Sequence, residues 1–181
     1  NTGGGINMSD FCDPTVTGNL IDSNIADSTG GGIHVREYSD PEIHENTITN
    51  NQVVGLYGDG GGIAGASGCA AMILNNTIDG NFAYSGGGIW WSDGSWYDPT
   101  IEINTITNNS ATIGGGIWTE GVATPIRNNY IANNAASSGG GAYIRNEIMI
   151  GNVILQNSTS GSGAGIYIAP HGSPSIEDCL I

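Results

Sequence analysis

The stretch NTITNNSATIGGGIW, Asn104 to Trp118, contains the two short motifs from which the fold of this chain is predicted. The first motif has an asparagine, an isoleucine two residues later, and a second asparagine three residues after that isoleucine. The second motif is a run of three glycines followed by isoleucine. Because both motifs recur along the chain, internal repetition is the first structural signal to interpret.

The two motifs alternate with a nearly constant period of 24 to 30 residues. Glycine triplets begin at Gly3, Gly30, Gly60, Gly86, Gly114 and Gly139, and a weaker copy, GAGI, begins at Gly163. The isoleucine and second asparagine of the six asparagine motifs are Ile21 and Asn24, Ile48 and Asn51, Ile78 and Asn81, Ile106 and Asn109, Ile131 and Asn134, and Ile154 and Asn157. A third apolar element follows Pro14, Pro41, Pro99, Pro125 and Pro174.

Each unit therefore holds three short apolar segments separated by Gly, Asn, Asp or Pro, and none has the length or period of a helix. A strand of three or four residues cannot bury an apolar face alone, whereas stacked units form parallel sheets about 4.8 Å apart strand to strand. The usual hand of parallel crossovers favours a right-handed coil. The sequence thus predicts an all-β, right-handed parallel β-helix of about six to seven coils with three short parallel sheets.

The repeated asparagines are predicted to stack at one corner of the coil, where their amides form a ladder. The predicted ladder consists of Asn24, Asn51, Asn81, Asn109, Asn134 and Asn157. The glycines would allow unusual backbone angles and close approach at the next corner. Residues 1–181 are interpreted as a single domain, and because both ends lie within a unit, we expect a segment of a longer array.

These repeats resemble those of the right-handed parallel β-helix proteins, including surface adhesins and the polymorphic outer-membrane protein type. The units of that type combine a Gly-Gly-small-Ile tetrad with an apolar-x-x-Asn tetrad, and the resemblance covers the whole chain. It implies an extracellular or cell-surface location and an adhesive or structural role. Pectate-lyase-like enzymes share the architecture, so the resemblance also admits action on carbohydrate.

The charge balance narrows the class of partner. The chain has 17 acidic residues, three arginines and no lysine, giving a formal net charge of −14. Nucleic acid and anionic membrane surfaces both require a basic face, so neither is expected as a partner. Association with further repeats or copies of the same assembly is predicted, because open sheet edges need covering, and a glycan remains an alternative.

A search for catalytic groups finds no convincing constellation. The residues Arg36 and Arg145 share one offset after their triplets but lie four coils apart, about 19 Å, so they cannot hold one substrate carboxylate together. Two outward acids, Asp22 and Asp79, would lie about 9.6 Å apart, near the spacing of an inverting glycosidase. No basic or aromatic group converges on them, and we predict that the chain has no catalytic residues and is not an enzyme.

Metal and thiol chemistry are weakly indicated. The acids Asp13 and Asp40 precede equivalent prolines in adjacent coils, and two carboxylates stacked this closely would splay into water or share a cation such as calcium. No other cofactor is expected. The histidines His34, His44 and His171 have no metal-ligand spacing. The cysteines Cys12, Cys69 and Cys179 are odd in number, which leaves open whether two of them form a bridge.

An aromatic series is the strongest candidate for a binding surface. The residue after each triplet's apolar residue points outward if strands alternate, and in the last four coils these residues are Trp90, Trp118, Tyr143 and Tyr167. The stripe would be about 14 Å long. Three uses are compatible with it: mutual stacking that stiffens the sheet, contact with a protein or a second copy, and stacking on sugar rings. Trp91 should point inward, with Trp96 and Tyr97 in the following loop.

From these observations we predict a non-catalytic extracellular or cell-surface β-helix module with a structural, assembly or adhesive role. The alternative is a carbohydrate-binding or carbohydrate-active β-helix, and a complete acid and base pair in one groove would favour it. An ice- or mineral-binding face is a weaker third alternative, since its threonine series, Thr47, Thr77 and Thr105, ends at Tyr130.

Overall fold

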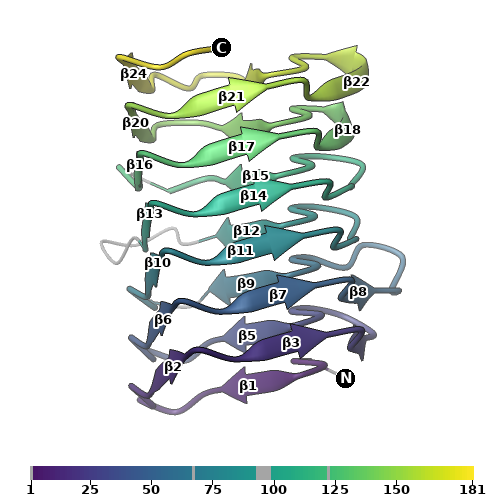
Figure 1. Cartoon of the computed structure of the whole chain (residues 1–181), viewed down its shortest axis with the longest axis vertical. Helices are drawn as coiled ribbons and strands as arrows, with labels where there is room; N and C mark the ends of the chain where they lie inside the picture. The colour runs from purple at the N-terminus through teal and green to yellow at the C-terminus, as the bar shows by residue number, and fades with distance from the viewer. Residues whose placement is uncertain (1, 67, 93–98, 122) are drawn as a thin grey trace.

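The computed structural model describes residues 2–66, 68–92, 99–121 and 123–181. In these residues all regular structure is β-strand, and the strands run parallel to one another in a stack of about six coils (Figure 1). The amino-terminal coil lies at one end of the stack and the carboxyl-terminal coil at the other. No part of the described chain forms a helix long and apolar enough to cross a membrane.

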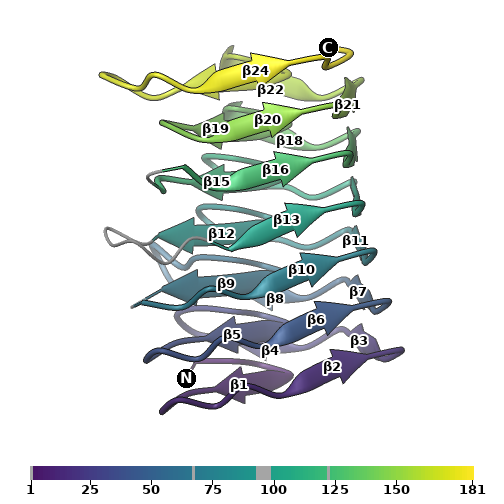
Figure 2. The same ribbon diagram turned by 90° about the vertical axis from the view of Figure 1, so that its left-hand side faces the viewer.

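Three long parallel sheets form the sides of the coil, and they are visible from two directions in Figures 1 and 2. The sheet after the glycine triplets, here the glycine sheet, has strands β1 (Ile6–Met8), β5 (Ile33–Val35), β9 (Ile63–Ala66), β12 (Ile89–Ser92), β15 (Ile117–Thr119), β19 (Ala142–Ile144) and β23 (Ile166–Ile168). The proline sheet has strands β2 (Thr15–Thr17), β6 (Glu42–His44), β10 (Met72–Leu74), β13 (Thr100–Glu102), β16 (Pro125–Arg127), β20 (Ile148–Ile150) and β24 (Ser175–Glu177).

The third sheet carries the asparagine motif and is called the asparagine sheet. Its strands are β3 (Leu20–Asp22), β7 (Thr47–Thr49), β11 (Thr77–Asp79), β14 (Thr105–Thr107), β17 (Tyr130–Ala132) and β21 (Val153–Leu155). The predicted fold and its three sheets are therefore confirmed.

A shorter fourth side, which sequence reasoning missed, closes each coil between the asparagine and glycine sheets. It contains two small parallel sheets, formed by β4 (Ile25–Ala26) with β8 (Gln52–Val53) and by β18 (Ala135–Ser138) with β22 (Ser158–Ser162). Isolated bridges at Phe82 and Ser110 connect the two sheets. We call this surface the fourth side.

The core is a set of isoleucine columns, because equivalent side chains of successive coils lie directly above one another. In the asparagine sheet the pairings match Ile48 with Ile78, Ile78 with Ile106 and Ile106 with Ile131, and all four side chains are completely buried. Full burial of such a side chain contributes roughly 1.5–3 kcal/mol. A column of identical residues therefore stabilises every coil in the same way, and it also fixes the register.

The asparagines form hydrogen-bonded ladders along the stack. The side-chain nitrogen of Asn81 donates to Ile48 O at 2.9 Å and to Asn109 Oδ1 at 3.0 Å. Its Oδ1 accepts from the backbone and side-chain nitrogens of Asn51 at 2.9 and 3.1 Å. Every donor and acceptor of this buried amide is thus used, which is the condition for burying a polar group without loss of stability.

A second ladder, which was not predicted, runs parallel to the first. It is formed by the first asparagine of each motif, namely Asn19, Asn46, Asn76, Asn104, Asn129 and Asn152. In the last coil Cys179 takes the equivalent place and accepts from Asn152 Nδ2 at 3.8 Å. Both corners flanking the asparagine sheet are therefore built in the same way.

The residue before each asparagine of this second ladder, and before Cys179, has a left-handed backbone conformation. Its φ values lie between 51° and 68° at Gly18, Glu45, Asn75, Ile103, Asn128, Gly151 and Asp178. Ile103 is the outlier of this series, because a β-branched side chain is poorly tolerated at positive φ. Its side chain is 58% exposed, so packing provides little compensation.

Replacing Ile103 with asparagine is expected to raise the free energy of unfolding by about 1 kcal/mol, since asparagine tolerates this conformation. Asn75 and Asn128 already occupy the equivalent place in the adjacent coils. The midpoint of urea unfolding measures the effect. Ile103→Val is the matched control and should leave stability unchanged within error, because it keeps the β-branch. Equal midpoints for the two variants would contradict the prediction.

Candidate functional site

The aromatic residues singled out in the sequence stand on four consecutive strands of the glycine sheet, β12, β15, β19 and β23. The sheet register aligns Trp90 with Trp118, Trp118 with Tyr143, and Tyr143 with Tyr167. Successive ring centroids are 5.4, 6.0 and 5.1 Å apart, and the ring planes differ by 11° to 21°. The four rings thus form one continuous stack parallel to the long axis, here the aromatic stack.

The stacking decides which atoms of these rings a partner could reach. All four side chains are only partly exposed, and both faces of Trp118 and Tyr143 lie against neighbouring rings. Offset stacking of this kind contributes about 0.5–1.5 kcal/mol per pair beyond burial. The inner rings therefore present their edges outward, whereas a sugar stacks on an aromatic face.

The adjacent Trp91 points inward, as predicted. It is 1% exposed and lies in the core between the coils of Gly65 and Thr119. A Cβ atom added at Gly65 would lie 2.2 Å from the Trp91 ring, so the glycine provides the room for the indole. The indole Nε1 of Trp91 has no hydrogen-bond partner in the described residues. Trp96 and Tyr97, placed by sequence in the following loop, lie outside the described residues.

Below the aromatic stack the same outward column continues with Ala64, His34 and Asn7. His34 is 6% exposed and its ring nitrogens lie 3.0 Å from Asn7 Oδ1 and 3.2 Å from Thr29 Oγ1. Burial, with a smaller contribution from the charge of Arg36, lowers the pKa of His34 to about 4. The imidazole is therefore a neutral structural group at neutral pH.

This histidine predicts a pH dependence of stability. The unfolded state, with a pKa near 6.5, binds a proton that the folded state refuses until about pH 4. Protonation of His34 therefore does not affect the free energy of unfolding above pH 6.5. It lowers that free energy as the pH falls from 6.5 towards 4, because only the unfolded state takes up the proton. We expect a loss of about 2 kcal/mol, after allowance for partial solvent screening.

Thermal unfolding of the parent chain and of His34→Gln at pH 7 and pH 4.5 measures this effect. The parent should lose more stability on acidification than the variant. Comparison with the variant is needed because Asp59 acts in the opposite direction: burial raises its pKa to about 6, against a smaller lowering by its hydrogen bond to Ser85. Equal losses in the two proteins would contradict the assignment to His34.

A buried carboxyl, Glu147, was not identified from sequence. It is fully buried and accepts from Thr119 Oγ1 at 2.6 Å, from Gly121 N at 3.0 Å and from Arg145 N. Burial raises its pKa, and these hydrogen bonds partly offset the rise. It precedes strand β20, at the place where prolines precede β2, β6, β13 and β24, so no repeat signal could mark it. Its contacts connect two adjacent coils, which indicates a structural role.

The two acids considered for calcium, Asp13 and Asp40, accept hydrogen bonds from backbone N–H groups. Asp13 Oδ1 accepts from Asp40 N at 2.8 Å, and Asp40 Oδ1 accepts from Ala70 N at 2.6 Å. Each carboxylate therefore binds a peptide N–H of the next coil, which explains their stacking without a cation. Across the described ranges, no group of three or more His, Cys, Asp or Glu side chains is arranged to hold a metal ion.

The acids considered for glycoside chemistry lie on the outer face of the asparagine sheet, with Thr49 between them in register. Asp22 accepts from Asn50 Nδ2 at 3.0 Å, and Asp79 accepts from Thr107 Oγ1 and Asn108 Nδ2, both at 2.6 Å. Both carboxylates are thus part of the hydrogen bonding between adjacent coils.

The arginines and cysteines likewise form no common site. Each arginine pairs with its own glutamate: Arg36 with Glu37, Arg127 with Glu102 and Arg145 with Glu120, at 2.7, 2.9 and 3.9 Å. None of the three cysteines forms a disulfide, with Cys12 exposed and Cys69 buried. The question of a bridge left open by the sequence is therefore answered: no two of these cysteines are joined by a disulfide.

The comparisons with known proteins agree with this geometry. The model of a family described as a right handed beta helix region matches residues 1–147 and 62–181, which together span the chain. Neither the curated proteins nor the solved structures gave a significant match. The family description names an architecture, and architecture alone does not specify chemistry.

Proposed function

The chain belongs to the right-handed β-helix family, and from that premise we propose that it is a non-catalytic structural module, a stiff rod presented outside the cell or at its surface. Its outer faces serve assembly or adhesion. The single observation that carries the proposal is that the carboxylates considered for catalysis or metal binding accept hydrogen bonds from adjacent coils. The extracellular location rests on the resemblance of the repeats to those of secreted and surface proteins.

Stiffness is expected from the arrangement of the contacts. Two amide ladders and the isoleucine columns run along the long axis and couple each coil to the next, and the aromatic stack adds a further connection between the last four strands of the glycine sheet. Bending the rod would stretch several of these columns together. A catalytic site, by contrast, needs polar groups that converge on one substrate atom, whereas the carboxylates of Asp22, Asp79, Asp13 and Asp40 accept hydrogen bonds from adjacent coils.

The glycan alternative has weaker support. Sugar rings stack on aromatic faces, and within the described residues only the outer faces of Trp90 and Tyr167 in the aromatic stack lack a ring neighbour. These contacts favour the first of the three uses considered for the stripe, the stiffening of the sheet.

The proposal is tested by incubating the chain with neutral and uronate-containing polysaccharides, with and without calcium. Release of reducing ends reports hydrolysis, and ultraviolet absorbance of an unsaturated uronate reports lyase activity. We expect neither. Cleavage that disappears in the double variant Asp22→Asn and Asp79→Asn would overturn the proposal.

The same samples test the role of the aromatic stack. Trp90→Ala combined with Trp118→Ala should lower the melting temperature, because two stacked pairs and their burial are lost. Binding to cells or glycans should be unchanged if the rings stiffen the sheet. A loss of binding at unchanged melting temperature would instead assign the stack to a partner.

A further inference from the structure

The fourth side carries a size gradient along its outward column. The column is aligned coil by coil by strand pairing and isolated bridges. Its members, from the amino-terminal end, are Ile25, Gln52, Phe82, Ser110, Ala135 and Ser158. The first three are large and the last three are small. Ile25 and Phe82 are 56% and 49% exposed and flank the exposed amide of Gln52, so the large half is a projecting ridge with an apolar side chain at each end.

A turn extends this ridge outward. Gly58 N donates to Gly55 O at 3.1 Å, which closes a turn whose tip is Leu56 and Tyr57, and these are 80% and 70% exposed. The turn is held on the coil below, since Val54 N donates to Ala26 O at 3.0 Å. Tyr57 also meets the Tyr84 ring edge-on at 5.2 Å. Rigid exposed apolar groups of this kind bind at low entropic cost.

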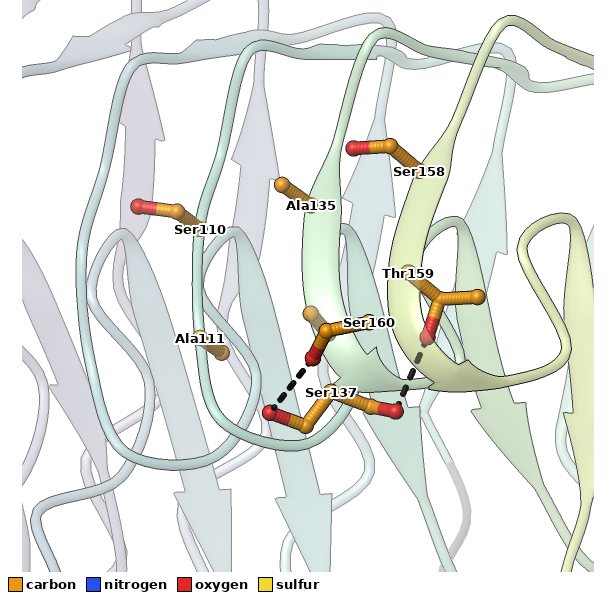
Figure 3. Close-up of a pocket in the computed structure, with 8 residues that line it drawn as sticks. Ser110, Ala111, Ala135, Ser137, Ser158, Thr159 and Ser160 are labelled. Carbon is orange, nitrogen blue, oxygen red and sulfur yellow. Dashed lines mark hydrogen bonds between the residues drawn. The ribbon is translucent and has the colours of Figure 1, made fainter.

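The small half of the column lies in a shallow groove of about 370 Å³, seen in Figure 3. Its lining residues are Ser110, Ala111, Ala135, Ala136, Ser137, Ser158, Thr159 and Ser160. Three of the hydroxyls are engaged within it: Thr159 Oγ1 donates to Ser137 O at 2.8 Å, and Ser160 Oγ lies 3.4 Å from Ser137 Oγ. The groove thus offers methyl groups and small hydroxyls, and no charge.

The distribution of charge singles out the same surface. The chain as a whole carries a net charge of −14, and two copies therefore repel each other over most of their surface. The segments that form the fourth side, 25–29, 52–59, 82–85, 110–113, 135–138 and 158–164, contain only two charged residues, Asp27 and Asp59. Both acids lie in the large half, and the groove carries no charge. When the groove of one copy faces the large half of another, no two acidic side chains of these segments are therefore brought together.

We propose that two copies of this chain pair antiparallel through their fourth sides, which goes beyond the proposed structural role but rests on it. A two-fold axis between the coils of Phe82 and Ser110 places Phe82 against Ser110 of the other copy. It likewise places Gln52 against Ala135 and Ile25 against Ser158, so that every large residue meets a small one. The Leu56 and Tyr57 turn of each copy then lies over the groove of the other.

Reversal of one copy is essential to this fit. Two copies side by side in the same direction would place ridge on ridge and groove on groove. The antiparallel arrangement uses the same surface on both copies and therefore closes as a dimer. Six ranks of strands span about 24 Å and four residues of strand span about 13 Å, so the face covers roughly 300 Å², well under the roughly 800 Å² per partner of a standard interface. We therefore expect a weak dimer that high salt strengthens by screening the repulsion.

Sedimentation equilibrium of the full chain between about 1 and 500 µM, at low and high salt, tests the proposal. The parent should dimerise, more strongly at high salt. Leu56→Lys should raise the dissociation constant at least tenfold, because it places a charge over the uncharged groove. The matched control is Leu20→Lys on strand β3, where a leucine of similar exposure, 70%, lies away from the fourth side. This control should associate as the parent does.

A complementary pair of variants tests the geometry itself. Ser137→Glu in the groove should weaken self-association like Leu56→Lys, and mixing the two variants should restore dimers through a new ion pair. Circular dichroism and melting temperature verify that each variant is folded. A parent that stays monomeric at all concentrations, equal effects of Leu56→Lys and Leu20→Lys, or a mixture that does not associate would each overturn the pairing. None of these results bears on the polysaccharide test of the proposed function.

Discussion

Replacement of Asn81 with alanine is expected to lower the free energy of unfolding by about 4 kcal/mol. The change removes the acceptor of two donors on Asn51, its backbone N–H and its side-chain nitrogen, and both are buried. It also removes the donor to Ile48 O and to Asn109 Oδ1. A buried donor left without a partner costs about 1–3 kcal/mol, and two such donors account for most of the effect.

Chemical denaturation followed by circular dichroism measures this loss. Gln52→Ala is the matched control, because it removes an exposed amide from the adjacent coil and should change stability by less than about 0.5 kcal/mol. If the two variants unfolded at the same denaturant concentration, the Asn81 amide would contribute little to the free energy of unfolding. Water would then replace it as the partner of the Asn51 donors. The isoleucine columns would then be the main connection between coils.

The repeat explains why so much of the fold could be predicted from sequence. When Ile48, Ile78 and Ile106 stack on one another, the same residue is selected at each level, and the contact becomes visible as a period. The register of the aromatic series followed from the same argument, since Trp90 and Trp118 keep one offset from their glycine triplets. Stacking of identical side chains thus converts a spatial contact into a sequence pattern.

The features that sequence reasoning missed are those in which neighbouring coils differ. On the fourth side, Gln52, Phe82 and Ser110 occupy equivalent places but share no chemical property, so no period marks the surface. Glu147 is buried where other coils have proline, and the partners that make its burial tolerable lie in the adjacent coil. Both features depend on contacts between unlike residues, which a single sequence does not reveal.

In the aromatic stack, too, the sequence predicts some features and not others. Sequence alternation gave the outward direction of the four aromatic residues but could not give the orientation of their rings, which depends on side-chain torsions. The ring planes are nearly parallel, at 11° to 21°, so the faces of Trp118 and Tyr143 are covered by neighbouring rings and a sugar could not stack on them. The second asparagine ladder was present in the motif itself, but only the geometry of the corner identifies the first asparagine as its member.

Replacement of Gly87 with alanine is expected to lower the free energy of unfolding by more than about 4 kcal/mol or to prevent folding. A Cβ atom there would lie 2.6 Å from both Gly115 O and Ser110 O, closer than van der Waals contact permits. Both atoms belong to the backbone. Gly87 N donates to Gly114 O at 3.1 Å and Gly88 N donates to Gly115 O at 3.1 Å, so the coils cannot separate locally without losing these bonds.

The matched control is Gly18→Ala, which separates close approach from backbone conformation. Gly18 has a φ of 68° and no atom within 4 Å of an added Cβ, so alanine there should cost only the left-handed conformation, about 1–2 kcal/mol. Soluble yield, circular dichroism and the denaturation midpoint of the two variants provide the comparison. If Gly87→Ala cost no more than Gly18→Ala, the coils would be able to move apart at the glycine corner. The stiffness on which the proposed structural role depends would then have to come from the asparagine ladders, the isoleucine columns and the aromatic stack.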